Sequence, residues 1–358
     1  AKFNQLRQEL QQAVIQAPEA DRLRRRLDLA RFYFAHGYGP EALGMLGLIV
    51  AAQPELEDQP EFRALRGAAL ALAGDFGAAK ADLVLPALEN QPDARLWRAV
   101  AAAGLDDWQG AAQDFQAGRA VLDDYPDVTY RKLALTGAEA LAETGSPTEA
   151  ARALDRLEGR VAGADSLPAV RYLRARIHAA AGRVEEALEI WRDLGSSGDN
   201  KFRTRAQYAL AVVEQESGRA PPEETLARLE RLRFAWRGDA FEMKVLNRLG
   251  EAYLAGGDYP NGIDTLRTAL ALFPDDPGAQ AIAQRVTRVF ADLFLKDGAK
   301  ALAPLDALAL FDRYRELAPR GAEGDAIERQ LAERLVEIDL LGRAAEMLEA
   351  QVARKLQG

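Results

Sequence analysis

Apolar residues recur along this chain at the spacing of an amphipathic α-helix, in short segments that meet at a glycine or an aspartate. The clearest example is 245–276, VLNRLGEAYLAGGDYPNGIDTLRTALALFPDD, in which each half has one apolar stripe. The stripes consist of Leu246, Leu249, Ala252 and Tyr253, and of Ile263, Leu266, Ala269 and Leu270. Each half is too short to be stable as an isolated helix. Because Gly256, Gly257 and Asp258 permit a tight reversal and Pro274 ends the second half, the segment is predicted to be a helical hairpin.

The same pattern repeats along the sequence. Turn residues between two helix-patterned segments recur about every 38 residues, a period typical of helical repeat proteins. They are Gly37, Gly74, Asp106, Gly145, Gly182, Gly218, Gly257, Gly298 and Gly342. Because a hairpin of this kind buries its apolar face on its neighbours, the repetition predicts a stacked array of about nine hairpins.

The hairpin 245–276 resembles the tetratricopeptide repeat (TPR), a helix-turn-helix unit. The resemblance is carried by Leu249, Gly250, Tyr253, Gly257, Tyr259, Leu266, Ala269 and Pro274. One departure is Gly262, where the family usually has alanine, although glycine is also small enough for a close helix crossing. A second unit matches almost as well, through Leu29, Ala30, Tyr33, Gly37, Ala42, Leu46 and Pro54.

Weaker matches continue along the rest of the sequence. The best repeats are 24–54 and 244–276, degenerate repeats fill 60–240, and divergent repeats follow in 278–358. The resemblance implies an all-α fold, a right-handed α-solenoid of about nine TPR-like helix-turn-helix repeats, as a single superhelical domain over 1–358.

The two ends of the sequence are typical of a processed protein or of a fragment of a longer one, and we favour the fragment. The first residue is Ala1, and the last unit ends with an apolar stripe that needs a neighbour, formed by Met347, Leu348, Val352 and Leu356. Either more repeats follow in the parent protein or this end is a cap. The segments RLRFAWRGD and RLVEIDLLGRAAEMLEAQV are similar to parts of large bacterial TPR-containing proteins associated with the cell envelope, whose activity is unassigned. This weaker resemblance favours a periplasmic over a cytoplasmic location.

Charge and composition exclude several classes of function. The net charge of −9 repels phosphate backbones, so nucleic acid is not an expected partner. The one basic stretch, RLRRRLDLAR at 22–31, is interpreted as a solvated helix face, with docking of an acidic partner as the alternative. The absence of cysteine excludes disulfides and thiolate catalysis, and no apolar run is long enough to span a bilayer.

No catalytic or metal-binding constellation is found in the sequence. The two histidines, His36 and His178, lie near turns and are interpreted as packed between helices. Nucleotide, zinc-protease and serine-hydrolase motifs are absent, and the paired carboxylates lack a burial pattern that would separate their pKa values. We therefore predict no enzyme activity, no cofactor and no metal.

In a helical repeat array the first helices of successive hairpins line one concave face. On this sequence that face is expected to include Arg24, Leu27, Arg31, Phe34, Leu96, Val100, Leu135, Tyr172, Arg176, Arg205, Tyr208, Lys244, Asn247 and Glu251. Aromatic and arginine residues carry much of the binding energy at interfaces. The central part of this face therefore predicts a groove for an extended or helical peptide of acidic character. It consists of Tyr172, Arg176, Arg205, Tyr208, Lys244 and Asn247. The alternative is ordinary surface.

The leading hypothesis is thus a protein-interaction scaffold that assembles a larger complex. The alternatives are a structural protein that stacks end to end and, with less support, a saccharide-binding module or an enzyme. Some TPR domains bind the C-terminal carboxylate of a chaperone through lysine and asparagine residues of three consecutive repeats. In this sequence Lys244 and Arg248 fit the third of these repeats, but Tyr172, Arg176 and Ala209 occupy positions of the earlier ones that need lysine and asparagine. This carboxylate clamp is therefore incomplete here. The sequence does not decide the oligomeric state.

An Arg-Gly-Asp tripeptide occurs in RLRFAWRGDAFEMK at 231–244. The repeat register places Gly238 at the left-handed position after a helix and Asp239 at the N-cap of the next, with Glu242 completing a capping box. The tripeptide is therefore predicted to be a joint between packed helices, and an adhesion loop is the alternative.

Overall fold

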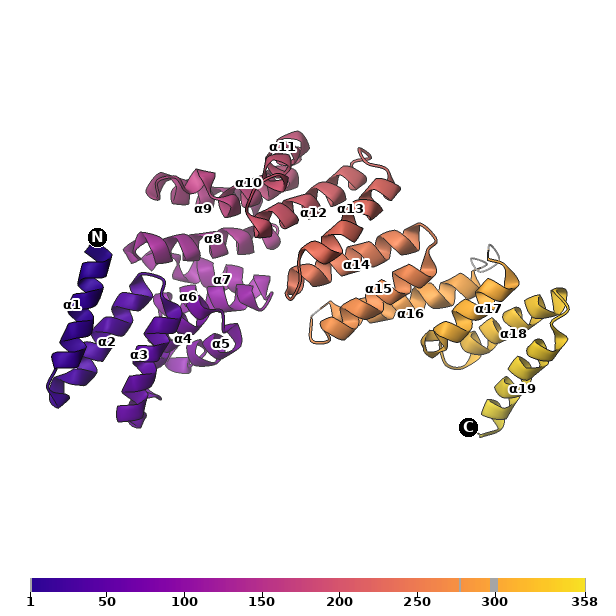
Figure 1. The fold of residues 1–358 in the computed structure, drawn as a ribbon, viewed down its shortest axis with the longest axis horizontal. Coiled ribbons are helices and arrows are strands. Elements are labelled where there is room, and N and C mark those ends of the chain that lie inside the picture. Colours follow the sequence, from indigo (N-terminus) through magenta and orange to yellow (C-terminus); the bar gives the residue numbers. More distant parts are fainter. Residues whose placement is uncertain (1, 277, 297–301, 358) are drawn as a thin grey trace. The chain divides into compact units, whose positions relative to one another are not determined.

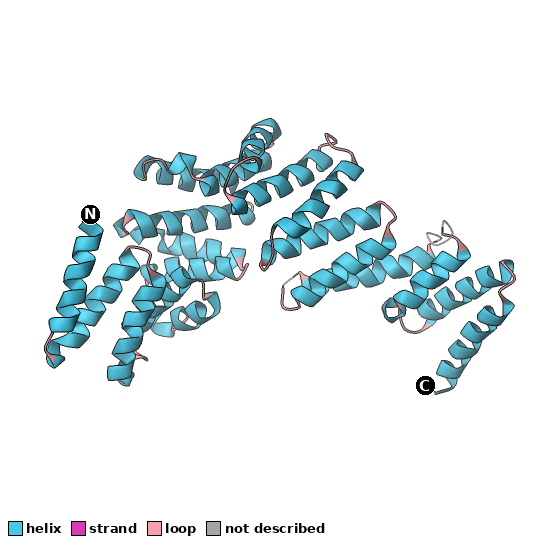
Figure 2. Ribbon diagram, viewed as in Figure 1, coloured by secondary structure: helices cyan, strands magenta, loops and turns pink. Residues whose placement is uncertain are grey.

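The computed structural model describes residues 2–276, 278–296 and 302–357, which form helices joined by short loops and contain no strand (Figures 1 and 2). The α-helices are α1 (Lys2–Gln16), α2 (Glu19–Ala35), α3 (Gly39–Ala52), α4 (Pro60–Ala73), α5 (Phe76–Leu83), α6 (Pro92–Gly104), α7 (Trp108–Gly118), α8 (Asp127–Glu143), α9 (Pro147–Arg160), α10 (Pro168–Ala180), α11 (Val184–Gly195), α12 (Asn200–Glu216), α13 (Pro222–Ala235), α14 (Ala240–Ala255), α15 (Tyr259–Leu272), α16 (Ala279–Leu295), α17 (Pro304–Arg313), α18 (Ala322–Glu337) and α19 (Leu341–Gln357). The prediction of an all-α fold is confirmed.

Consecutive helices pack as hairpins, and the hairpins stack on one another. The most extensively packed pairs are α6–α7, α14–α15, α2–α3, α8–α9, α10–α11, α4–α5 and α18–α19. First helices of successive hairpins also touch, since α4 contacts α6, α6 contacts α8 and α8 contacts α10. Each hairpin thus buries apolar surface on its neighbours, which is the construction of an α-solenoid.

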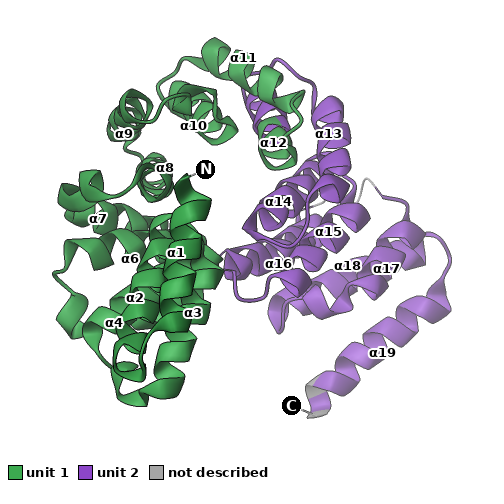
Figure 3. Ribbon diagram, turned by 60° about the vertical axis from the view of Figure 1, so that its left-hand side comes forward, with its two compact units in different colours: residues 1–206 green, residues 207–358 purple. Residues whose placement is uncertain are grey.

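The chain divides into two compact units, residues 1–206 and 207–358, which we call unit 1 and unit 2 (Figure 3). The largest fully buried side chain of unit 1 is Trp97. Unit 2 has an aromatic core that includes Phe290, Phe311 and Tyr314. A single domain over the whole chain, with about nine repeats, stays a prediction.

Most of the predicted turns lie where the sequence placed them. The backbone is left-handed at Gly37, Gly74, Asp106, Gly145, Gly182, Gly218 and Gly257. Gly298 lies outside the described residues. The prediction for Gly342 is wrong, because the left-handed residue is Asp339, with a φ of 64°, and Gly342 already belongs to α19. Aspartate tolerates this backbone conformation better than most residues, so glycine is not required there.

Small residues permit the close crossing of helices within and between hairpins. A Cβ atom on Gly262 would lie 2.6 Å from the side chain of Leu254 and 3.2 Å from the carbonyl oxygen of Gly250. Glycine at 262 therefore allows α15 to approach α14 closely. At Gly137 of α8 a Cβ atom would lie 2.2 Å from the ring of Phe115. Glycine at 137 therefore allows α7 and α8 to pack closely in the same way.

The Arg-Gly-Asp tripeptide is the joint between α13 and α14, as predicted. Gly238 is left-handed, with a φ of 95°. The Asp239 carboxylate accepts hydrogen bonds from the backbone N–H groups of Phe241 (3.0 Å) and Glu242 (3.4 Å). Glu242 in turn accepts a hydrogen bond from the N–H of Gly238 (2.7 Å). The tripeptide thus ends one helix and caps the next.

Candidate binding surface

Three of the predicted groove residues of unit 1 lie together on α10 and the first part of α12. Tyr172 is 9% exposed, and its ring lies 6.0 Å from that of Phe202, between centroids. Burial raises the pKa of the Tyr172 phenol, although the charges of Arg176 and Arg205 act in the opposite direction. The tyrosine is therefore a neutral, buried side chain with two guanidinium groups in its electrostatic environment.

Both arginines are held by carboxylates of α8. Arg176 donates a hydrogen bond to Glu143 (2.7 Å), and Arg205 forms an ion pair with Glu139 (3.5 Å). Burial disfavours the charge of Arg176, but the surrounding negative charge, including Glu143, outweighs burial and raises the pKa of its guanidinium. These residues of α8, α10 and α12, the first helices of three successive hairpins, form a group that we call the first-helix cluster. It consists of Glu139, Glu143, Tyr172, Arg176, Phe202 and Arg205.

Two lysines add positive charge beside the first-helix cluster. Burial lowers the pKa of Lys132, the charge of Lys201 lowers it further, and Glu139 opposes both effects. Within the described residues neither lysine forms an ion pair, whereas both arginines do. Lys132 and Lys201 thus add two cations near the carboxylate of Glu139, which also pairs with Arg205.

In unit 2 the predicted residues of α14 belong to a second polar group. Asn247 donates a hydrogen bond to Glu251 (3.3 Å), and Arg285 of α16 donates one to Asn247 (3.2 Å) and pairs with Glu251. Lys244 is exposed. The sequence reasoning missed Arg285, although it lies 38 residues after Asn247, one repeat later.

The remaining predicted residues have different surroundings. Arg24 and Arg31 are exposed on α2, whereas Phe34 packs against Trp97 with ring centroids 5.1 Å apart. The half-buried ring of Tyr208 meets that of Phe241 edge-on at 5.4 Å. Leu96 and Val100 are buried in the core of unit 1, and Leu135 is half-buried. The structure therefore brings the predicted residues together in small groups within each unit.

Both histidines make local contacts near the ends of their helices. His36 Nδ1 lies 2.8 Å from the carbonyl oxygen of Phe32, and His178 Nδ1 lies 2.7 Å from the Glu186 carboxylate. No group of side chains suited to holding a metal ion occurs in the part of the chain that the structure describes. None of the helices described is long and apolar enough to cross a membrane.

Comparison with known proteins supports the fold. Residues 245–276 match the family model of the tetratricopeptide repeat. Among solved structures, NprR in complex with its cognate peptide NprX is 12% identical, with a TM-score of 0.58 over 88% of this chain and 98% of that chain. A tetratricopeptide repeat protein from Parabacteroides merdae ATCC 43184 is 12% identical, with a TM-score of 0.51 over 75% of this chain and 98% of that chain.

A third solved structure, the human IFIT1 dimer with PPP-AAAA, is 15% identical, with a TM-score of 0.50 over 99% of this chain and 87% of that chain. A comparison with curated proteins gives no match. The fold and these similarities define an α-solenoid of stacked helical hairpins. The segment 245–276 matches the tetratricopeptide repeat, and the chain shares the fold of solved tetratricopeptide repeat proteins.

Proposed function

We propose that this chain is a protein-interaction scaffold that binds an acidic segment of a partner protein on the first-helix cluster and so helps to assemble a larger complex. The main support is the group of cationic side chains, Arg176, Arg205, Lys132 and Lys201, around the buried Tyr172. NprR, which shares the fold, has been solved with a peptide bound. An acidic segment complements the cluster electrostatically, and this favours specificity and fast association.

The residues of the cluster have separate roles in this proposal. Glu143 and Glu139 hold Arg176 and Arg205 in place, which reduces the ordering cost when a partner binds. Each guanidinium has five N–H donors, so a carboxylate partner leaves others for a bound segment. Lys132 and Lys201 supply the charge that no carboxylate of the described residues neutralises by an ion pair.

The proposal is tested by reversing the charge of the two lysines. We expect Lys132→Glu with Lys201→Glu to reduce capture of partner proteins from a cell extract at least tenfold, measured by quantitative mass spectrometry. The matched control reverses Lys2 and Arg152, which are exposed on α1 and α9. The control should capture the same proteins as the unmodified chain, and thermal unfolding of both variants verifies the fold. An unchanged set of captured proteins with the lysine variant would refute the assignment of the surface.

Exposed apolar side chains on both terminal helices support end-to-end stacking of chains as a further candidate. On α1 Leu6 and Ile15 are 45% and 73% exposed among polar side chains such as Gln5, and α19 exposes Leu341 and Val352 at 57% and 55%. Such side chains gain from mutual burial. Light scattering over a range of concentrations tests this alternative, and a length that grows with concentration would favour it.

RNA is the second candidate ligand, because human IFIT1 has been solved with PPP-AAAA. The net charge of −9 and the carboxylates that pair with both arginines of the cluster favour a protein partner. Titration with a single-stranded oligonucleotide at low salt distinguishes the two candidates. A place in a bacterial envelope complex belongs to the same proposal and is tested by cell fractionation.

A further inference from the structure

The last turn of α13 exposes an aromatic side chain that takes no part in the packing of its hairpin. Leu229 and Leu232 of α13 are buried in a core cluster of unit 2, together with Phe241 of α14. Phe234 lies outside this cluster and is 70% exposed. Of the aromatic side chains that the structure describes, only Tyr38 is also exposed, at 40%, and its ring carries a polar hydroxyl. Phe234 is therefore the most exposed apolar ring of the described residues.

Two arginines lie against this ring at the joint between α13 and α14. The guanidinium carbons of Arg233 and Arg237 lie 5.7 and 5.8 Å from the centroid of the Phe234 ring, close enough for cation–π interactions. Within the described residues neither arginine forms an ion pair, and the same holds for the exposed Arg231, three residues before Phe234. The exposed ring is thus surrounded by three cations, and we call these four residues the arginine–phenylalanine patch.

The carboxylates that are close to these arginines in the sequence have other hydrogen-bond donors. Glu230 accepts a hydrogen bond from the hydroxyl of Tyr253 (2.5 Å). Asp239 caps α14, where it accepts hydrogen bonds from two backbone N–H groups and from the indole that follows α13. Because neither carboxylate pairs with a guanidinium of the patch, the N–H donors of Arg233 and Arg237 stay available to an external anion.

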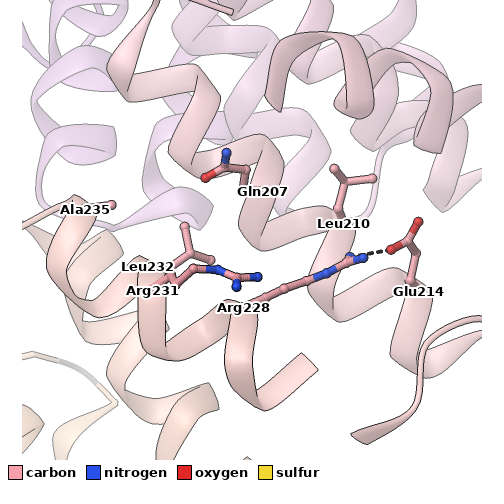
Figure 4. Close-up of a pocket in the computed structure, with 7 residues that line it drawn as sticks. All are labelled: Gln207, Leu210, Glu214, Arg228, Arg231, Leu232 and Ala235. Atoms are coloured by element: carbon pink, nitrogen blue, oxygen red, sulfur yellow. Dashed lines mark hydrogen bonds and ion pairs between the residues drawn. The ribbon is translucent and has the colours of Figure 1, made fainter. Parts of the chain in front are cut away.

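The ring is not part of the pocket that this hairpin contains. That pocket, of about 370 Å³, lies between α12 and α13 within unit 2 (Figure 4). It is lined by Gln207, Leu210, Glu214, Arg228, Arg231, Leu232 and Ala235. Phe234 is not among the lining residues, and a ring that is 70% exposed is not enclosed by its own chain. Aromatic anchors of protein interfaces are enclosed in packed, desolvated pockets. An unenclosed ring is better suited to a soft surface that closes around it.

We propose that the arginine–phenylalanine patch makes a peripheral contact with the headgroup region of an anionic lipid bilayer. The Phe234 ring leaves water by entering the boundary between headgroups and acyl chains. Arg233 and Arg237, which lie against the ring, bind the lipid phosphates just above it. A bilayer thus satisfies the ring and the guanidinium groups at the same depth. The patch does not include the first-helix cluster, so either proposal can fail while the other holds.

The net charge of −9 does not prevent this contact at physiological ionic strength. Charges are screened beyond about 8 Å at 0.15 M salt, so distant carboxylates have little effect on the patch. Each arginine near an anionic membrane surface strengthens binding roughly fivefold. The three arginines of the patch therefore favour anionic over neutral vesicles by about a hundredfold.

The test is cosedimentation of the whole chain with vesicles at about 0.15 M salt. We expect binding to phosphatidylcholine vesicles that contain about 30% phosphatidylglycerol, and at least tenfold weaker binding to phosphatidylcholine alone. Arg233→Gln with Arg237→Gln should weaken binding to the anionic vesicles about 25-fold, because two charges are lost. Phe234→Ser should weaken it about tenfold, whereas Phe234→Leu keeps an apolar side chain and should retain most of the binding.

Matched controls come from exposed side chains of the same unit outside the patch. Leu305→Ser removes an aliphatic side chain that is 56% exposed. Arg288→Gln with Arg320→Gln removes two exposed arginines that form no ion pair within the described residues. Both controls should bind anionic vesicles like the unmodified chain. Thermal unfolding of all variants should be unchanged, since none of them alters a buried side chain.

Three results would overturn the inference. The first is equal binding of the unmodified chain to anionic and neutral vesicles. The second is binding of the patch variants to anionic vesicles at the level of the controls, which would place any membrane contact elsewhere on the chain. The third is tighter binding of a single-stranded RNA oligonucleotide at the same salt concentration, lost in the same variants, which would assign the patch to nucleic acid.

Discussion

The Asp239 carboxylate joins the start of α14 to the tryptophan that follows α13, and its removal has a predictable cost. Besides the two backbone N–H groups that it caps, it accepts a hydrogen bond from Nε1 of Trp236 (2.8 Å). The hydrogen bond from the N–H of Gly238 to Glu242 does not involve Asp239 and remains after its replacement. Asp239→Ala thus deletes three hydrogen bonds at one half-buried point.

The expected loss of unfolding free energy in Asp239→Ala follows from these three hydrogen bonds. Loss of an N-cap costs about 0.5–2 kcal/mol. A hydrogen bond to a charged group contributes about 1.5–3 kcal/mol when buried, but Trp236 is half-buried and water can replace the acceptor. We therefore expect Asp239→Ala to lower the free energy of unfolding of unit 2 by about 2–3 kcal/mol. Asp239→Asn keeps an equivalent cap and loses only the charge near the helix N-terminus, about 0.3–1 kcal/mol.

The assay must resolve one unit at a time, because a chain with two compact units need not unfold in one step. Amide hydrogen exchange followed by mass spectrometry reports α14 and the helices of unit 1 separately. Exchange in α14 should accelerate strongly in Asp239→Ala and weakly in Asp239→Asn, with unit 1 unchanged. Equal acceleration in the two variants would refute the capping argument, since it would show that charge alone matters.

Two other predictions concern packing and pH. Gly137→Ala places a methyl group against the buried ring of Phe115 and should lower the free energy of unfolding by about 1–3 kcal/mol in urea denaturation. The control Gly47→Ala adds a Cβ that meets nothing within 4 Å in α3 and should raise it by about 0.5–1 kcal/mol. Burial and the hydrogen bond to Glu230 raise the pKa of Tyr253 to about 12, so its stabilising contribution is complete below pH 10 and is lost as the pH rises toward 12. Ultraviolet titration of the unmodified chain against Tyr253→Phe should show no tyrosinate from this residue at pH 10.5, and full ionisation there would contradict the prediction.

The features that the sequence predicted are those that depend on neighbouring residues of the chain. The turn at Gly257, the cap at Asp239 and the helices on either side follow from backbone preferences over a few positions. The carboxylate partners of the arginines were not predicted, because they come from other repeats. Glu143 precedes Arg176 by 33 positions, and degenerate repeats leave the register between them undecided.

Residues that depart from the repeat pattern have physical consequences of their own. Glu214 occupies the position at which the hairpin 245–276 has the aromatic residue Tyr253. In physical terms a carboxylate inside a hairpin requires a cationic partner, and α13 supplies Arg228 one helix later. The ion pair is therefore foreseeable from the sequence, whereas the pocket is not, because its volume depends on the distance between the helices. Glu214→Tyr alone would remove one partner of the ion pair and leave Arg228 with only the exposed carboxylate of Glu224. Replacing Gln207, Glu214 and Arg228 by leucine, tyrosine and leucine removes both partners and should close the pocket without loss of stability, since an ion pair replaced as a whole by apolar side chains often leaves stability unchanged.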